Sequence, residues 1–447
     1  MLSDTIAALA TAPGRAAIAL IRVSGRDAFG VAARVLRPFD GGQPRRARRS
    51  QAVAGEAHDP LDDVLYAVFP APASYTGEDM VEITTHGGLL VPGEVLGALL
   101  AAGARPAAPG EFTRRALANG KLDLLQAEAI ADLVDATAPA QRRAALQQLD
   151  RGLSARLGGL RDEVLALEAL LSYDLDFPEE DSGPVAPARV DAALVTVRAA
   201  VGDLLATAAD GERLREGALC VIAGRPNTGK SSLFNALLGR ERAIVTDRPG
   251  TTRDAIEAPA TCDGFPFRLV DTAGLRDSDD LVERLGIEVS WRYLAAADVV
   301  LLCVEAGRPL VGEERLFLDA LQSPALLVRT KGDLEASAPA DPAELRVSAL
   351  RGDGLPALRE RLAGLAFATL ATHADLAPVI TRERHRVALA RALAELEAFA
   401  AARASGLEPV VATTYLRAAV TALEDVIGVV TGEDVLDRVF ASFCVGK

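Results

Sequence analysis

The chain has 447 residues, of which 50% are hydrophobic and 25% are charged, and its formal net charge is −14. This length and apolar content provide for two or three folded domains, which excludes a largely disordered chain. The negative charge argues against a broad nucleic-acid-binding surface, although a local basic patch is compatible with it.

Residues 1–118 are predicted to form a small α/β domain. Short apolar runs bounded by turn residues indicate strands, and a longer run with apolar residues three and four apart indicates a helix. The predicted strands are residues 5–10, 16–23, 63–69 and 80–85, and the predicted helix is residues 90–102.

Two features of this domain have two interpretations each. The basic run at 45–49 is either a local nucleic-acid-binding patch or a solvated loop. His86 precedes two glycines and lies near the acids Glu78, Asp79 and Glu82, so it is either a turn residue or a catalyst. The sequence of this domain shows neither a hydrolytic triad nor metal-ligand spacing.

Residues 119–216 and 372–447 are predicted to be the two parts of one α-helical bundle domain. Both are rich in Ala and Leu, with apolar residues three and four apart, and an acidic, proline-containing loop at 177–184 interrupts the first part. Each part alone would expose an apolar face. We therefore expect the two parts to pack together, with residues 217–371 inserted between them.

The inserted segment alternates short β runs with helical stretches, which predicts a doubly wound, mainly parallel sheet. Its predicted strands are residues 219–223, 267–270, 299–304, 326–329 and 345–347. The whole chain is therefore predicted to be an α/β multidomain protein with a small α/β domain, a split helical domain and an inserted nucleotide-binding domain.

The sequence GRPNTGKS at 224–231 follows the first of these strands and precedes a helix-like stretch, which is the context of a phosphate-binding loop. Its glycines allow backbone N–H groups to surround phosphate oxygens, and the helix N-terminus adds the positive end of its dipole. We expect Lys230 to contact the β- and γ-phosphates and Ser231 to bind Mg²⁺. The predicted nucleotide contacts in this loop are Asn227, Thr228, Gly229, Lys230, Ser231 and Ser232.

Two downstream stretches are typical of nucleotide switches. GTTRD at 250–254 offers the hydroxyl of Thr252 to Mg²⁺. DTAG at 271–274 ends a predicted strand and offers Asp271 near Mg²⁺ and the N–H group of Gly274 to the γ-phosphate.

Two later stretches predict that the nucleotide is GTP. After the fourth predicted strand, Asp333 can accept hydrogen bonds from guanine, and the stem of Lys331 can lie over the base. Ser348 and Ala349 would close over the guanine oxygen. Thr330 stands where Asn is usual in this motif, which weakens the prediction of guanine specificity.

The residue after Gly274 is Leu275, where Ras-type GTPases have a Gln that orients the attacking water. Hydrolysis therefore needs another form of assistance. The segment 246–252 is long enough to surround a monovalent cation with backbone carbonyl groups, and Asn227 lies in the phosphate loop.

The rare residue types add three expectations. Of the 48 basic residues only four are lysines, at 121, 230, 331 and 447, so each should stand where a guanidinium will not serve. The cysteines at 220, 262, 303 and 444 are too scattered for a zinc site or a disulfide framework, and the first three are predicted to pack. No uninterrupted apolar run reaches the ~18 residues of a membrane span, and no signal peptide is recognised, so a cytoplasmic protein without a membrane segment is expected.

The whole chain resembles the family of tRNA modification GTPases called MnmE or TrmE. The resemblance rests on the GTPase motifs and on further stretches, of which the Lys121 stretch and the terminal Cys-x-Gly-Lys are the most specific. These stretches are DTIAA at 4–8, PGR at 13–15, SYTGED at 74–79, HGG at 86–88, PGEFT at 109–113, KLDLLQAEAI at 121–130 and FCVGK at 443–447.

The resemblance implies a homodimer whose N-terminal domain, residues 1–118, dimerises and binds a one-carbon carrier of the 5-formyl-tetrahydrofolate type. It also implies an FAD-dependent partner of the MnmG (GidA) type. Together the two would install a (carboxymethyl)aminomethyl group at C5 of the wobble uridine, U34, of certain tRNAs, while the GTPase domains meet with the aid of K⁺.

The resemblance also implies roles for individual residues. Asn227, Thr246, Arg248 and Thr251 would surround K⁺, with Thr246 and Thr251 also close to GTP. Glu283 would orient the attacking water, although without the resemblance it reads as an exposed helix acid. With Asp271 and Lys230 it forms the candidate catalytic group.

For the folate, the resemblance implies contacts from Arg22, Glu82, Lys121 and Lys447. Cys444 would lie nearby, either as a chemical participant or as a packing residue. The alternative function is an RNA-assembly GTPase of ribosome biogenesis, in which no substrate chemistry occurs. Such proteins usually append a basic RNA-binding domain, which this acidic chain lacks.

Overall fold

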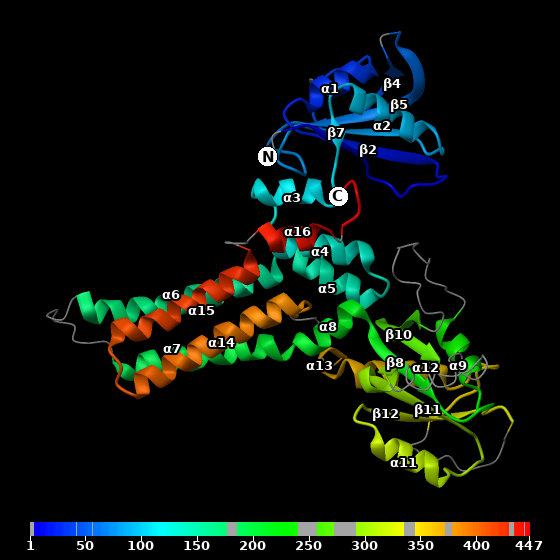
Figure 1. Ribbon diagram of the computed structural model, residues 1–447, viewed down its shortest axis with the longest axis vertical. Helices are drawn as coiled ribbons and strands as arrows, with labels where there is room; N and C mark the ends of the chain where they lie inside the picture. The colour runs from blue at the N-terminus through cyan, green and yellow to red at the C-terminus, as the bar shows by residue number, and fades with distance from the viewer. Residues whose placement is uncertain are drawn as a thin grey trace. The chain divides into compact units, whose positions relative to one another are not determined.

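The computed structural model describes residues 4–41, 43–55, 57–176, 186–239, 257–271, 292–334, 345–371, 378–428, 433–441 and 443–447. The chain divides into two compact units (Figure 1). The N-terminal unit comprises residues 1–131 and 427–447, and the central unit comprises residues 132–426.

The N-terminal unit is built on one seven-stranded sheet, in the order β3-β4-β5-β6-β2-β1-β7. All neighbouring strands are antiparallel except β1 and β7, which are parallel. The strands are β1 Ile6–Leu9, β2 Ile18–Ser24, β3 Leu36–Arg37, β4 Arg48–Ala54, β5 Asp59–Phe69, β6 Met80–His86 and β7 Arg105–Pro106.

Helices α1 (Ala28–Val35) and α2 (Val91–Ala101) cover one face of this sheet, and β1 also contributes side chains to a smaller core on the other face. Ala7 belongs to the core beneath α1 and α2. Ile6 and Ala8 instead contact Phe112 of α3 (Glu111–Ala118). The period of two along the strand thus directs its side chains to two cores.

The C-terminal segment belongs to the N-terminal unit. Helix α16 (Glu433–Ala441) and the residues after it bury Phe440 and Phe443 against Ala127 of α4 (Leu124–Asp135), whose first turns lie in this unit. The terminal motif is therefore carried to the N-terminal sheet from the far end of the sequence.

The predicted strands and the predicted helix of the N-terminal unit are confirmed, whereas α1, α3, β3, β4 and β7 were not predicted. The interpretation of the run 45–49 as a loop is wrong for Arg48 and Arg49, which begin β4. Their guanidinium groups are paired with Asp40 and Asp63. The strand was missed because its polar start, RRSQ, hides the alternation that indicates a strand.

The helical part of the central unit contains α5 Pro139–Leu149, α6 Gly152–Asp176, α7 Pro187–Ala206, α8 Ala208–Glu216, α14 Glu383–Ala404 and α15 Pro409–Ile427. Helix α7 packs against both α6 and α14, so the two parts of the sequence form one bundle as predicted. Ion pairs join the same two parts, Arg403 with Asp191 at 2.9 Å and Arg417 with Glu168 at 2.6 Å. The predicted loop at 177–184 lies outside the described residues.

One stretch of this bundle, residues 187–216, is long and apolar enough to cross a membrane by length and composition alone, among the residues that the structure describes. Asp191, Arg198 and Asp203 interrupt it. Its α7 part buries Val190, Leu194, Val197 and Val201, and packs against α6 and α14. These four apolar residues are thus used within the bundle.

The second sheet of the chain lies in the central unit and has six strands, in the order β13-β12-β11-β8-β10-β9. All pairs are parallel except β9 with β10, which confirms a mainly parallel sheet. The strands are β8 Ala218–Ala223, β9 Glu257–Cys262, β10 Phe265–Asp271, β11 Val299–Glu305, β12 Ala325–Thr330 and β13 Leu345–Arg346, of which β9 was not predicted.

This sheet is covered on both faces, as a doubly wound fold requires. Helices α9 (Lys230–Leu238) and α12 (Leu355–Ala366) pack on one face, and α11 (Gly312–Ala320) packs on the other. The short helix α13 (Ala368–Ala371) follows α12. The core beneath α9 and α12 also includes Ala140 of α5 and Leu214 of α8. The helical bundle therefore shares a core with the sheet.

Candidate functional site

The phosphate loop begins where the fully buried strand β8 ends. Gly224 has φ of +145°, and a Cβ atom there would lie 2.5 Å from the carbonyl oxygen of Cys303, so only glycine fits. Gly229, with φ of +84°, precedes the nine-residue helix α9. The loop thus leads directly into a helix N-terminus, which favours bound phosphate.

Lys230 is held inside the curve of this loop. Lys230 is only 7% exposed, and its Nζ donates a hydrogen bond of 2.8 Å to the carbonyl oxygen of Arg225. The hydroxyl of Thr228 donates to the same oxygen at 2.8 Å. The positive charge is therefore held inside the loop whose backbone N–H groups would surround phosphate oxygens.

Ser231 and Asp271 come together at the carboxyl ends of neighbouring parallel strands. The Ser231 hydroxyl donates a hydrogen bond of 2.7 Å to Oδ2 of Asp271, the last residue of β10. A hydroxyl and a carboxylate oxygen are ligands that Mg²⁺ accepts, with phosphate and water completing an octahedron. Within the described residues no group of three or more His, Cys, Asp or Glu side chains could hold a metal without such help.

A cavity of about 150 Å³ lies beside the loop. The Ser348 hydroxyl donates a hydrogen bond of 2.8 Å to Oδ1 of Asp333 at its wall. This bond lowers the pKa of Asp333, which keeps the carboxylate ready to accept hydrogen bonds from a base. The lining residues are Gly229, Ser232, Leu233, Thr330, Lys331, Asp333, Val347, Ala349 and Leu350.

Thr330 joins the base side of the site to the phosphate side. Its hydroxyl lies 2.6 Å from the carbonyl oxygen of Thr228 and 3.3 Å from that of Val304. Because a hydroxyl has one proton, the shorter contact with the phosphate loop is the stronger hydrogen bond. Thr330 thus holds the phosphate loop in position in addition to lining the cavity.

The neighbouring Lys331 adopts φ of +56° and extends its Nζ to Oε1 of Glu305 at 2.9 Å. The ion pair holds its aliphatic stem along the cavity that Asp333 also lines. This position agrees with the predicted role of the stem as a surface for the base.

The structure therefore brings together the predicted GTP contacts of the phosphate loop, Asp271 and the guanine side. The remaining predicted residues of the nucleotide site lie outside the described part of the chain, namely Thr246, Arg248, Thr251, Thr252, Gly274 and Glu283. Their roles remain predictions.

A second group of predicted residues meets on the sheet of the N-terminal unit. Arg22 of β2 stands opposite Glu82 of β6, and its Nε donates to Oε1 of Glu82 at 3.0 Å. The guanidinium group also lies 5.4 Å from the ring centroid of Tyr75, whose hydroxyl lies 2.8 Å from that of Thr113. Tyr75 was not singled out in the sequence, although it belongs to the SYTGED stretch.

The C-terminal tail joins this group. Arg22 Nη1 donates to the carbonyl oxygen of Gly446 at 3.4 Å, and the backbone N–H of Phe112 donates to that of Lys447 at 3.2 Å. Gly446 has φ of +95°, and a Cβ atom there would lie 2.5 Å from the carbonyl oxygen of Leu9. Glycine is therefore required for the tail to reach the sheet.

The other two predicted members lie close to the same stretches. Nζ of Lys121 donates to the carbonyl oxygen of Pro72 at 3.0 Å. Cys444 is exposed, and its carbonyl oxygen accepts a hydrogen bond of 3.4 Å from the N–H of Gly110. The thiol of Cys444 is thus accessible, whereas Cys220, Cys262 and Cys303 are buried, as predicted for packing residues.

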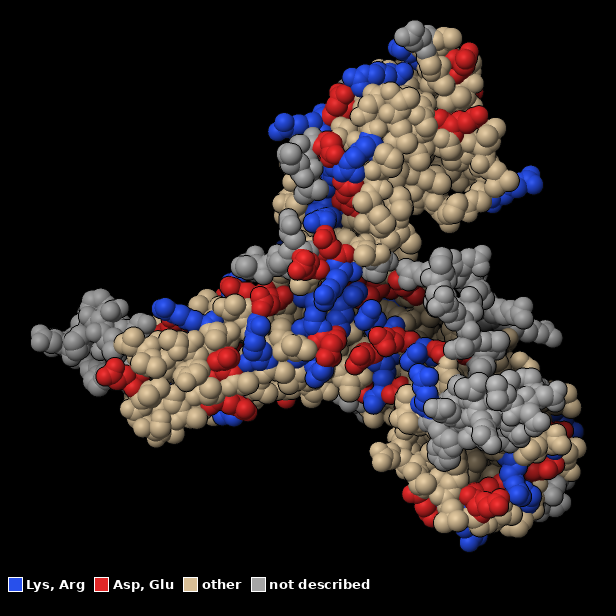
Figure 2. Space-filling model, viewed as in Figure 1, with Lys and Arg blue, Asp and Glu red and all other residues tan. Residues whose placement is uncertain are grey.

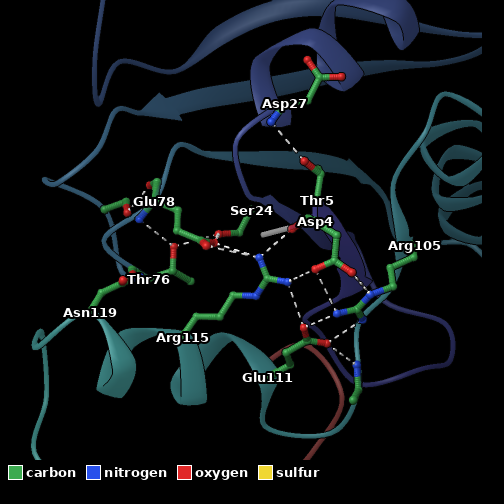
Figure 3. A network of polar contacts seen from close by, with 12 residues as sticks. Asp4, Thr5, Ser24, Asp27, Thr76, Glu78, Arg105, Glu111, Arg115 and Asn119 are labelled. Carbon is green, nitrogen blue, oxygen red and sulfur yellow. Dashed lines mark hydrogen bonds and ion pairs between the residues drawn. The ribbon is translucent and has the colours of Figure 1, made fainter. Parts of the chain in front are cut away.

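A fully buried arginine holds three of the recognised stretches together (Figure 3). Arg115 of α3 contacts the side chains of Asp4 at 2.8 Å, Glu78 at 3.0 Å and Glu111 at 2.9 Å. It also donates to the carbonyl oxygen of Asp4 at 2.7 Å. These motif residues therefore act in the fold, a role that their spacing in the sequence does not reveal.

The same network strongly lowers the pKa of two carboxyl groups. Hydrogen bonding by Arg105 lowers the pKa of Asp4 to about 2. Burial alone would raise the pKa of Glu111, but hydrogen bonds from Arg105, the N–H of Ala108 and Arg115 lower it to about 2. Both carboxylates therefore stay ionised well below neutral pH.

His86 is not part of this network. It ends β6 with an exposed side chain, and its Nδ1 lies 2.7 Å from Oδ1 of Asp62. The interpretation of His86 as a turn residue is therefore wrong, because it is the last residue of a strand and pairs with Ile18 of β2, and the turn begins after it.

The phosphate loop follows a central parallel strand and has an acid–hydroxyl pair on one side and a Thr-Lys-Gly-Asp cavity on the other. This arrangement defines a P-loop GTPase. Two family models match the rest of the chain as well, the GTP-binding protein TrmE N-terminus at residues 5–121 and the MnmE helical domain at residues 124–444. The chain belongs to the MnmE family of tRNA modification GTPases.

Two full-length relatives agree with this assignment. The chain is 42% identical to the tRNA modification GTPase MnmE of Heliobacterium modesticaldum, over 100% of both chains. It is 46% identical to the protein of that name from Methylorubrum populi, over 99% of this chain and 98% of the relative. Among solved structures, the G domain of the T. maritima FeoB iron transporter is 26% identical over 33% of this chain and 98% of its own, with a TM-score of 0.25.

Proposed function

We propose that this protein hydrolyses GTP with the aid of Mg²⁺ and K⁺ and works in the cytoplasm as a homodimer. With an FAD-dependent partner of the MnmG type, it installs a (carboxymethyl)aminomethyl group at C5 of U34 in certain tRNAs. A tetrahydrofolate of the 5-formyl type supplies the one-carbon unit. Residues 1–118 bind the folate and dimerise, residues 217–371 form the GTPase domain, and residues 119–216 with 372–447 join them.

The observation that carries the GTPase part is the Ser231 hydroxyl 2.7 Å from the Asp271 carboxylate, beside the buried Lys230. These two oxygens would hold Mg²⁺ together with Thr252, and the ion would neutralise charge on the phosphates. The hydrogen-bonded Asp333 supports guanine as the base, because a carboxylate accepts from two neighbouring N–H groups.

The K⁺ part is supported by the backbone of the phosphate loop. Asn227 adopts φ of +62°, a conformation that few residues other than glycine and asparagine tolerate, and its side chain is exposed. Its amide oxygen is the side-chain ligand of the proposed K⁺ site, with Thr246, Arg248 and Thr251 supplying mainly backbone oxygens. Glu283 would orient the attacking water in place of the absent Gln.

The folate part is supported by Arg22, whose guanidinium contacts Glu82, the C-terminal tail and the ring of Tyr75. A guanidinium paired with a carboxylate can match the donor and acceptor pattern of a pterin ring, and an aromatic side chain can lie against it. Lys121 and Lys447 would meet the glutamate tail of the carrier. The exposed Cys444 lies on the same tail and is a candidate participant in the transfer.

The experiment that tests this function is calorimetric titration of the full chain with 5-formyl-tetrahydrofolate. The wild type should bind, and Lys121→Ala should bind at least about tenfold more weakly, because an ammonium contact to the carboxylate is lost. Lys331→Ala, which changes the nucleotide cavity, is the matched control and should bind as the wild type does. Absence of binding by the wild type would contradict the enzyme function and favour the RNA-assembly GTPase.

A further inference from the structure

We propose that the exposed arginines of α5 and of the start of α6 form the surface on which the central unit receives the phosphate backbone of tRNA. These arginines are Arg142, Arg143, Arg151 and Arg156, and together they are called the arginine face. The proposal rests on the proposed function in tRNA modification and names where the protein meets that substrate.

The first argument is the local balance of charge. Residues 136–160 contain these four arginines and a single acid, Asp150, in a chain whose net charge is −14. An acidic protein that handles a polyanion needs a local region where the sign of the potential is reversed. In this segment the local charge is positive although the chain as a whole is negative.

The second argument is that the four guanidinium groups have no protein partner in the part of the chain that the structure describes. Figure 2 shows basic side chains over this part of the bundle interleaved with acidic ones, and most of the bundle arginines are in fact paired. Those paired with a carboxylate are Arg161, Arg198, Arg213, Arg215, Arg382, Arg386, Arg391, Arg403 and Arg417. An arginine without such a partner can offer its planar fork to a phosphate without first breaking an ion pair.

The third argument is that the arginine face is rigidly mounted. The opposite side of α5 buries Ala140, Ala145 and Gln148. The N–H of Ala140 donates to the carbonyl oxygen of Gly264 at 2.9 Å, at the turn between β9 and β10. Since the helix is fixed on the sheet domain, its outward charges keep their spacing, which reduces the entropy lost on binding.

The junction between the two helices is short. Arg151 adopts φ of +64° between the end of α5 at Leu149 and the start of α6 at Gly152. Arg156 is then exposed in the second turn of α6, while Leu153 and Leu157 are buried. The four charges are thus carried by two consecutive helices and the short junction between them.

The composition of the face favours a phosphate backbone over the alternatives. It carries no aromatic side chain on which bases could stack, so it fits contacts to phosphate rather than base readout. Leu146, 47% exposed, is the large apolar side chain among the exposed residues of α5. Binding to an anionic membrane normally adds a buried apolar face, and one leucine does not provide it.

The test measures the affinity of the full-length protein for unmodified tRNA over a range of salt concentrations. In one variant all four arginines of the face are changed to Gln, as Arg142→Gln, Arg143→Gln, Arg151→Gln and Arg156→Gln. In the matched control, four ion-paired arginines are changed, as Arg198→Gln, Arg386→Gln, Arg391→Gln and Arg403→Gln. Both variants lose the same formal charge, so the comparison isolates position from net charge.

We expect the face variant to bind tRNA at least about tenfold more weakly at about 0.15 M salt, with the slope of log K against log salt reduced by roughly 3, because each phosphate contact releases counterions. The control should keep a slope near that of the wild type. GTP hydrolysis in the absence of tRNA should be the same in all three proteins. The double variant Arg142→Gln, Arg143→Gln leaves the helix junction intact and should show about half of the change in slope.

Three outcomes would overturn the proposal. Equal affinity and slope for the wild type and the face variant would exclude the arginine face while leaving the tRNA function standing. No tRNA binding by the wild type would remove the inference together with the substrate on which it rests. Vesicles of phosphatidylglycerol that bind the wild type but not the face variant, with tRNA binding unchanged, would assign the face to a membrane.

Discussion

The hydroxyl of Thr330 lies 2.6 Å from the carbonyl oxygen of Thr228, so the strand that leads to the base side is hydrogen-bonded to the phosphate loop. Thr330 is 4% exposed and Thr228 is 5% exposed. A hydrogen bond between two buried groups is costly to leave unmade. This one bond therefore connects the two halves of the nucleotide site.

Thr330→Val removes this bond while keeping the shape of the side chain. The buried carbonyl of Thr228 loses its donor, which costs about 1–3 kcal/mol, so GDP affinity should fall by about fivefold or more. Fluorescent GDP titration checks this. Thr330→Asn is the control, because an amide N–H group can donate to the same carbonyl, and unchanged affinity in Thr330→Val would contradict the role assigned to the bond.

Asn227→Ala tests the proposed K⁺ site. In the wild type, GTP turnover should rise when Na⁺ is replaced by K⁺, and the variant should lose this response because the amide oxygen is the side-chain ligand. Steady-state phosphate release in matched chloride salts is the measurement. Equal rates of the wild type in the two salts would exclude K⁺ assistance.

Glu283→Ala tests the proposed water-orienting acid. Turnover should fall by about a hundredfold or more while GTP affinity stays close to the wild-type value, because the residue acts on the transition state. Single-turnover hydrolysis and nucleotide titration separate the two effects. A variant that no longer binds GTP would show a structural role instead.

The Arg115 network predicts a dependence of stability on pH. Asp4 and Glu111 have a folded-state pKa of about 2, below their ordinary values of 3.8 and 4.5. For acids with a depressed pKa, the stabilisation is present above the ordinary value and is lost as the pH falls towards the folded value. The N-terminal unit should therefore lose stability between about pH 4.5 and pH 2.

Hydrogen exchange of the α3 amides in the full chain, corrected for intrinsic rates, measures this loss. Glu111→Gln should lower protection at neutral pH and flatten its fall in acid, because the titrating carboxylate is gone. Glu94→Gln changes an exposed acid of α2 and should keep the wild-type profile. A Glu111→Gln profile parallel to that of the wild type would contradict the assignment.

The nucleotide site could be predicted from the sequence because its residues follow the ends of parallel strands. Each motif is short, and its role depends on backbone geometry within a few residues, as at Gly224 and Gly229. The doubly wound sheet places these strand ends together, so order along the chain was sufficient to predict Asp271 beside Ser231. The role of Thr330 was missed, because its partner Thr228 lies 102 positions away.

The Arg115 network lay beyond sequence reasoning for the same reason. Its members Asp4 and Glu78 are 111 and 37 positions from Arg115, and no periodicity relates them. Strands β4 and β9 were missed because their polar or small residues show no clear alternation. The helix α1 was missed because it has only eight residues between two strands, too few to establish a helical period.

The most direct test of the proposed function is nucleoside mass spectrometry of tRNA from a strain that lacks the gene, complemented either with the wild type or with Ser231→Ala. We predict that (carboxymethyl)aminomethyl-uridine derivatives at U34 are absent from the deletion strain, are restored by the wild type and are not restored by Ser231→Ala, because the Ser231–Asp271 pair of the GTPase site is broken. A deletion strain with unchanged U34 modification would contradict the function in tRNA modification. Restoration by Ser231→Ala equal to that by the wild type would contradict the need for this GTPase site.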